Sequence, residues 1–113
     1  MTIDPKFKLS EDASEEQRLI HKTIISIMGE DAEYSGGCKG FYTEEEWAAR
    51  GESYGDKAPI VVVHDGGGAA PFFNYDYEDY KKVERMTKAL GKIGYYASPC
   101  TNWYTAIYPV EVA

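Results

Sequence analysis

The chain is 113 residues long and carries a formal net charge of −7. This length supports a single modest core, so we expect residues 1–113 to form one domain. The acidic balance argues against direct nucleic-acid binding and favours a basic protein partner, or a nucleic-acid-binding protein whose site an acidic surface can occupy. Neither a transmembrane-length apolar run nor a signal segment is found, so we expect a cytoplasmic protein with no membrane partner.

The first elements expected along the chain are an arm and a helix. Residues 1–13 mix charges with a proline and show no hydrophobic period, which predicts a loosely held N-terminal arm. Ser14 and Gln17 have the spacing of a capping box and predict the start of a helix. An apolar stripe of isoleucines and a methionine continues until Gly29, where we expect this helix to end.

The next segments predict a strand and two more helices. Glu33–Tyr42 has the pattern of an extended segment bent by two glycines. Thr43 with Glu46 forms a second capping box, which begins a short helix. Asp76 or Asn74 caps a third helix, whose apolar side chains recur three or four residues apart.

Ala58–Asp76 is the stretch around which we expect the chain to be organised. Ile60–Val63 is an unbroken β-branched run, which is typical of a strand buried on both faces. The run leads directly into His64, Asp65 and three glycines. A central strand followed by a flexible glycine loop is a frequent location of functional residues.

These elements together predict an α+β fold. We expect a small mixed sheet of about four strands, two longer helices on one of its faces, and one short helix. The expected strands are Glu33–Tyr42, Ile60–His64, Tyr95–Ser98 and Trp103–Tyr108.

The two halves of the chain also resemble each other. When Cys38 is aligned with Cys100, four further residues fall on identical ones: Gly29, Tyr34, Tyr42 and Thr43. We interpret the match as an internal helix–strand duplication, since repeats of this kind determine architecture. It predicts either two similar packing units beside the central strand or a cleft between the two halves.

The two cysteines leave several roles open. They are too few for a disulfide scaffold, and no CxxC or HxxxH spacing supports zinc, so we expect no metal and no cofactor. Free thiols packed as small apolar groups are the ordinary role of such residues. The alternative is a small enzyme with Cys38 or Cys100 as nucleophile and His64 as base.

Gly66, Gly67 and Gly68 form the loop after the central strand. The chain lacks the nucleophile elbow that an esterase requires and the Gly-Lys-Ser/Thr ending of a P-loop. Three glycines can present backbone N–H groups to an anion, which makes the loop a candidate nucleotide-binding segment. The alternative is a loop that turns sharply or passes close to another segment.

Aromatic and acidic residues alternate from residue 72 to residue 80. Tyrosine offers contact area and a polar tip at low entropic cost, and the acids between the rings suit a basic protein partner. The candidate binding residues of this stretch are Phe72, Phe73, Tyr75, Asp76, Tyr77, Glu78 and Asp79. The pattern predicts an exposed acidic-aromatic contact surface, and no catalytic residue is assigned.

Two stretches carry a family resemblance. PIVVVHDGGGAAPFFNYD and the ending CTNWYTAIY resemble segments of short uncharacterised proteins encoded by phages and other mobile elements. The resemblance covers about the second half of the chain. It implies an anti-defence inhibitor of the anti-CRISPR kind, or a protein that sequesters a nucleotide signal, acting in the host cytoplasm.

We therefore expect a non-enzymatic binding protein that blocks a macromolecular partner through its acidic-aromatic surface. The first alternative is a small-ligand binder, for a nucleotide, that uses the glycine loop. The second alternative is the cysteine-dependent enzyme.

Overall fold

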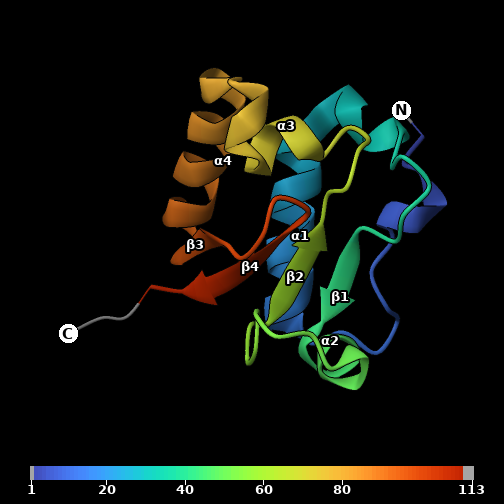
Figure 1. The fold of residues 1–113 in the computed structure, drawn as a ribbon. Coiled ribbons are helices and arrows are strands. Elements are labelled where there is room, and N and C mark those ends of the chain that lie inside the picture. Colours follow the sequence, from blue (N-terminus) through green and yellow to red (C-terminus); the bar gives the residue numbers. More distant parts are fainter. Residues whose placement is uncertain (1, 111–113) are drawn as a thin grey trace.

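The computed structural model describes residues 2–110, whose four strands form one sheet in the order β1-β2-β4-β3 (Figure 1). The strands are β1 (Phe41–Thr43), β2 (Ile60–Val63), β3 (Tyr95–Pro99) and β4 (Tyr104–Pro109). The helices are α1 (Glu15–Met28), α2 (Glu44–Arg50), α3 (Ala70–Phe73) and α4 (Tyr80–Lys92), with the 3-10 turns η1 (Pro5–Phe7), η2 (Gly29–Glu33) and η3 (Tyr75–Tyr77). The two longer helices pack against one face of the sheet, which confirms the predicted α+β fold.

All three strand pairs of the sheet are antiparallel. The sheet is therefore antiparallel throughout, and not mixed as the sequence pattern suggested. β2 and β3 do run in the same direction, but β4 lies between them and pairs with both. A connection through helices, such as the one from β2 to β3, usually joins two neighbouring parallel strands. Here β4 lies between β2 and β3, so the two parallel strands are not neighbours.

The face of the sheet that α1 and α4 cover carries a mainly aliphatic core, to which four phenylalanines also contribute. Val62 and Ile107 point into it from neighbouring strands, and Ile24 and Leu90 meet them from the two helices. All four side chains have no exposed surface. Burial of such side chains contributes on the order of 2 kcal/mol each to folding, so this face supplies much of the stability.

The opposite face of the sheet is aromatic. Val61 and Val63 point into a second cluster with Trp47 of α2 and Tyr104 of β4. The loop after α2 adds Ala58 to this cluster. All four residues of β2 are buried, which confirms the prediction of a strand covered on both faces.

Both predicted capping boxes are present, but the third helix begins later than predicted. The side chain of Asn74 caps η3, and that of Asp79 caps α4. Glu78 lies between them in the left-handed region, with φ of 55°, and therefore ends η3 before the helix can begin. The prediction that Asp76 or Asn74 caps this helix is thus wrong.

The predicted strand Glu33–Tyr42 is much shorter in the structure. It begins as part of η2, continues as a loop through Gly36 and Gly37 with φ of 75° and 91°, and is extended in β1 alone. Segment 95–99 of the other half is a strand, so the two halves do not repeat the same elements. What the two halves share is one strand each beside the central strand: β1 and β4 flank β2 on opposite sides.

Residues 2–13 are held against the domain. Phe7 is buried and packs edge-on against Phe41 at 5.9 Å between ring centroids. The Asp4 amide donates to the Ala32 carbonyl at 2.9 Å. These contacts replace the loosely held arm that the composition predicted, because the one aromatic side chain of the segment enters the core. Across residues 2–110, no helix has both the length and the apolar character needed to cross a membrane.

Candidate functional site

The predicted acidic-aromatic stretch divides into a buried part and an exposed part. Phe72 and Phe73 are only 2% and 3% exposed and belong to the core below α4, so their prediction as contact residues on an open surface is corrected. The side chains of Tyr75, Tyr77 and Tyr80 are 55%, 50% and 61% exposed. We call the outer part the acidic-aromatic surface; it comprises Tyr75, Asp76, Tyr77, Glu78, Asp79 and Tyr80.

Local hydrogen bonds explain why the two tyrosines of η3, Tyr75 and Tyr77, point outward. The Asn74 side chain accepts from the Asp76 amide at 2.9 Å, and its amide nitrogen donates to the Asn102 carbonyl at 3.0 Å. The latter bond fixes η3 to the turn between β3 and β4. Because the left-handed Glu78 then reverses the chain before α4, the short turn has no inward face on which to bury its rings.

A second acidic segment, η2, meets this surface. Lys82 of α4 forms ion pairs with Asp31 of η2 at 3.2 Å and with Asp79 at 3.9 Å. Glu30, which precedes Asp31, is exposed, and Tyr34, which follows η2, is 66% exposed. The sequence prediction missed this segment, although residues 30–34 show the same mixture of acids and tyrosine as the predicted stretch.

The glycine loop packs against η2 and the residues that follow it. A Cβ atom on Gly67 would lie 2.4 Å from the carbonyl carbon of Ser35, and one on Gly68 would lie 1.8 Å from the backbone carbonyl oxygen of Asp31. The Gly68 amide donates to the Tyr34 carbonyl at 2.7 Å. The glycines therefore allow a close backbone approach that holds the segment after η2, which agrees with the alternative reading of this loop.

His64 is buried where the central strand enters that loop. Its Nε2 atom lies 2.9 Å from the Thr105 hydroxyl, and its ring stacks on Phe73 with centroids 5.7 Å apart. Burial lowers the pKa of His64 to about 4, so the ring is neutral at pH 7. Its Nδ1 atom has no hydrogen-bond partner among the described residues.

The two thiols are engaged with backbone carbonyls. Cys38 Sγ lies 3.9 Å from the Asp65 oxygen, and Cys100 Sγ lies 3.5 Å from the Ser98 oxygen. Burial raises the pKa of Cys100, which lowers its thiolate fraction at neutral pH. Within residues 2–110, no hydrogen bond joins either thiol to His64, the contact that a cysteine-dependent mechanism requires.

A further aromatic group, which sequence reasoning did not find, lies on the other side of the sheet. Arg50 of α2 lies over three rings, with its guanidinium carbon 5.2 Å from the Tyr42 centroid, 5.0 Å from Trp47 and 5.8 Å from Trp103. It donates to the Tyr42 hydroxyl at 3.0 Å. We call Tyr42, Trp47, Trp103 and Tyr104 the packed aromatic cluster.

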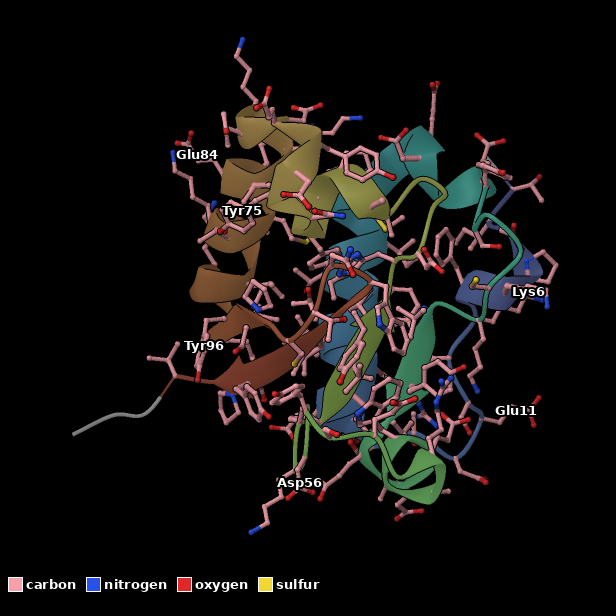
Figure 2. The ribbon with its side chains drawn as sticks, viewed as in Figure 1. Lys6, Glu11, Asp56, Tyr75, Glu84 and Tyr96 are labelled. Carbon is pink, nitrogen blue, oxygen red and sulfur yellow. The ribbon has the colours of Figure 1, made fainter. Side chains whose placement is uncertain are left out.

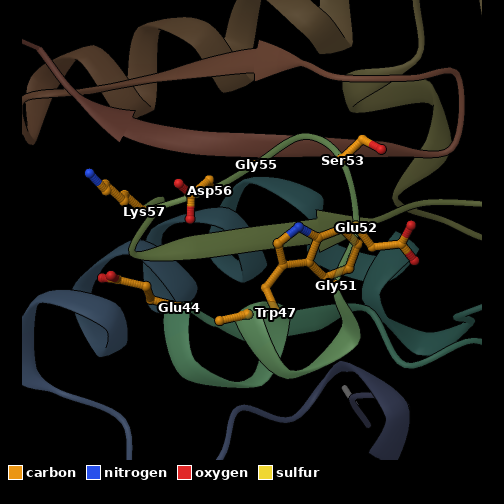
Figure 3. Close-up of a pocket in the computed structure, with 9 residues that line it drawn as sticks. Glu44, Trp47, Gly51, Glu52, Ser53, Gly55, Asp56 and Lys57 are labelled. Atoms are coloured by element: carbon orange, nitrogen blue, oxygen red, sulfur yellow. The ribbon is translucent and has the colours of Figure 1, made fainter.

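The hollow beside α2 is a separate feature of that side. Figure 3 shows it between α2 and the loop that follows, with the Trp47 ring in its middle. Its volume is about 310 Å³, and its charged lining residues are Glu44, Glu52, Asp56 and Lys57. None of the residues predicted as a binding site lines this hollow.

In the described part of the chain, no three His, Cys, Asp or Glu side chains are grouped so that they could hold a metal ion. Comparison of the chain with protein-family models, with curated proteins and with solved structures gave no match.

Proposed function

We propose that this chain is a non-enzymatic binding protein that blocks a basic protein partner through its acidic-aromatic surface. The observation that carries the proposal is the exposure of Tyr75, Tyr77 and Tyr80 beside carboxylates that two distant segments bring together. A tyrosine that is half exposed in the free protein can bury its ring in a partner at little entropic cost.

The charges around these rings support a basic partner. Asp76 and Glu78 are exposed and have no ion-pair partner among the described residues, whereas Asp31 and Asp79 share Lys82. Unpaired carboxylates accelerate encounter with a positively charged patch, and the tyrosines would then determine how slowly the complex dissociates. A nucleic-acid-binding site has the required positive charge, which fits an inhibitor of the phage anti-defence kind.

The two alternatives gain less support from the geometry. A nucleotide site on the glycine loop needs free backbone N–H groups, but Gly68 already donates to Tyr34 and the loop packs against the segment after η2. The cysteine-dependent reaction needs a thiol beside an imidazole, and His64 is bonded to Thr105 instead.

The proposal is tested by comparing two triple variants with the same change in charge. The first neutralises the surface with Asp76→Asn, Glu78→Gln and Asp79→Asn. The control neutralises three exposed acids, Glu11→Gln, Asp12→Asn and Glu15→Gln; Glu11 lies on the side of the molecule away from Tyr75 (Figure 2).

Each variant is immobilised and exposed to host lysate, captured proteins are identified by mass spectrometry, and binding of the purified partner is followed at several salt concentrations. We expect the first variant to associate more slowly and with a weaker salt dependence, while the control behaves as the wild type. Circular dichroism checks that the lost Asp79 cap has not unfolded α4. Equal binding by both variants would refute the proposal.

A further inference from the structure

The outer edge of β3 has unused backbone hydrogen-bonding groups. The Val110 amide donates to the Gly94 carbonyl at 2.8 Å and the Cys100 amide to the Tyr104 carbonyl at 3.2 Å, which marks these two as hydrogen-bonded pairs. In an antiparallel ladder such pairs alternate, so the N–H and C=O groups of Ala97 point away from β4. The described residues offer Ala97 no partner on that side.

The other edge of the sheet is protected. β1 is only three residues long, and beside it the Gly40 amide donates to the Lys6 carbonyl of the N-terminal segment at 2.8 Å. Short, covered edges prevent unwanted strand pairing. β3 is therefore the edge that remains available to another chain.

A hollow of about 120 Å³ lies along this free edge. Tyr96 and Ala97 both line it, although Ala97 packs toward the helices and Tyr96 toward Tyr108 on the opposite face, with centroids 6.0 Å apart. Because neighbouring residues of a strand point to opposite faces, a hollow that reaches both lies at the edge of the strand. Most of its other lining residues are apolar, Phe72 and Met86 among them.

This hollow is continuous with the acidic-aromatic surface. Tyr75 belongs to both, and Figure 2 shows Tyr75 and Tyr96 on the same side of the molecule. Asp76 follows Tyr75 and has an unpaired carboxylate among the described residues, whereas Glu84 and Lys88 on α4 neutralise each other at 2.9 Å. None of the residues that line the hollow is charged, and the unpaired carboxylate of Asp76 lies directly after its lining residue Tyr75.

We propose that the partner contributes an extended basic segment that adds to the sheet at β3. Its backbone pairs with the N–H and C=O groups of Ala97, one of its apolar side chains enters the hollow beside Tyr75, and its lysines or arginines face Asp76 and Glu78. This inference rests on the proposed function and specifies how that surface recognises its partner. Main-chain pairing provides affinity, while the hollow and the carboxylates select the sequence.

The test uses a blocked heptapeptide of alternating lysine and valine, with a glutamate–valine peptide as its control. Amide hydrogen exchange is followed by nuclear magnetic resonance on the full chain with and without each peptide. We expect saturating lysine–valine peptide to slow exchange of the Ala97 amide at least about tenfold, because that amide becomes hydrogen-bonded, and we expect no change with the glutamate peptide.

Two matched variants then separate the hollow from the rest of the surface. Thr87 is an exposed residue of α4 that lines the hollow, and Thr87→Arg fills it with a cation; Thr23→Arg makes the same change on α1. We expect Thr87→Arg to weaken binding of the lysine–valine peptide at least about tenfold, since it blocks the apolar seat and repels lysine, and Thr23→Arg to have little effect.

The outcomes distinguish this inference from the proposed function. If the acid-neutralised triple variant loses the peptide but wild-type Ala97 gains no protection, strand addition is refuted and the acidic surface stands. If neither the acids nor Thr87 affect binding, both are refuted. If the free chain sediments as a dimer whose Ala97 amide is already protected, a second copy occupies the edge and the inference is refuted.

Discussion

Two regions of this molecule are rich in aromatic side chains, and they use them differently. In the packed aromatic cluster each ring contacts another: Trp47 lies 4.8 Å from Tyr104 and 5.2 Å from Tyr42, and Arg50 covers the cluster from outside. Among the described residues, the exposed rings of Tyr75, Tyr77 and Tyr80 form no such ring pair. Aromatic rings that are satisfied within the chain maintain the fold, and rings without internal partners remain available to another molecule.

The largest effect expected is that of removing the centre of the packed cluster. Trp47→Ala deletes a ring that is 3% exposed and whose Nε1 donates to the Tyr54 carbonyl at 2.8 Å. We expect the free energy of unfolding to fall by about 4 kcal/mol, from lost burial and the cavity left behind. Urea denaturation measures this loss, and a value below about 1 kcal/mol would show that the cluster is not structural.

The second effect concerns His64, which supports the acidic-aromatic stretch by stacking on Phe73. The unfolded chain binds a proton on this ring below about pH 6.5, whereas the folded chain does so only near pH 4. The contribution of neutral His64 to the free energy of unfolding is thus fully present above pH 6.5. It is lost as the pH falls toward 4, and its size is roughly 3 kcal/mol.

The comparison that isolates this effect is His64→Gln against wild type, with urea unfolding measured from pH 7.5 to 4. We expect the variant to be less stable than the wild type at pH 7.5 and to show a shallower decline between pH 6.5 and 4, because it has no imidazole at this position to protonate. Parallel curves for the two proteins would place the acid sensitivity on other groups.

The third prediction concerns a variant that should lose affinity for the partner while keeping its stability. Tyr77→Ala removes a ring with 50% of its surface exposed, so we expect the free energy of unfolding to change by less than about 0.5 kcal/mol. Affinity for the partner should fall by about 2 kcal/mol, or roughly thirtyfold in Kd, mainly through faster dissociation. Biolayer interferometry measures the rates, and an unchanged dissociation rate would remove Tyr77 from the contact.

The smallest effect tests the cation over the packed cluster. Arg50→Gln retains a polar side chain but removes the charge that lies over Tyr42, Trp47 and Trp103. Because the guanidinium is exposed, we expect a loss of about 1 kcal/mol in unfolding free energy. Partner binding should be unaffected, and a binding defect in this variant would move the contact surface to α2.

Several of these features could be predicted from the sequence because they depend on neighbours along the chain. The capping boxes of Ser14 and Thr43 and the two-sided burial of Ile60–Val63 are local patterns, and the structure confirms them. The exposure of Tyr75 and Tyr77 likewise followed from an excess of rings over the space in one short segment.

Other features depend on distant contacts or on rare backbone conformations. The Lys82–Asp31 ion pair that joins η2 to the acidic-aromatic surface has no trace in local spacing. The late start of α4 results from the left-handed conformation of Glu78, which no residue preference indicates. Phe72 and Phe73 were predicted as contact residues together with the tyrosines, because only tertiary packing, which buries both under α4, distinguishes them from the exposed rings.

The locations of the two tryptophans have an optical consequence. Trp47 and Trp103 are the only tryptophans of the chain, and both belong to the packed aromatic cluster. Indole emission of the whole protein therefore reports on one side of the sheet. Trp103 follows Asn102, whose carbonyl accepts the hydrogen bond from Asn74 at the start of η3. A shift of that emission when a tryptophan-free peptide binds would show, without any attached dye, that binding beside η3 changes the surroundings of an indole on the other side of the sheet.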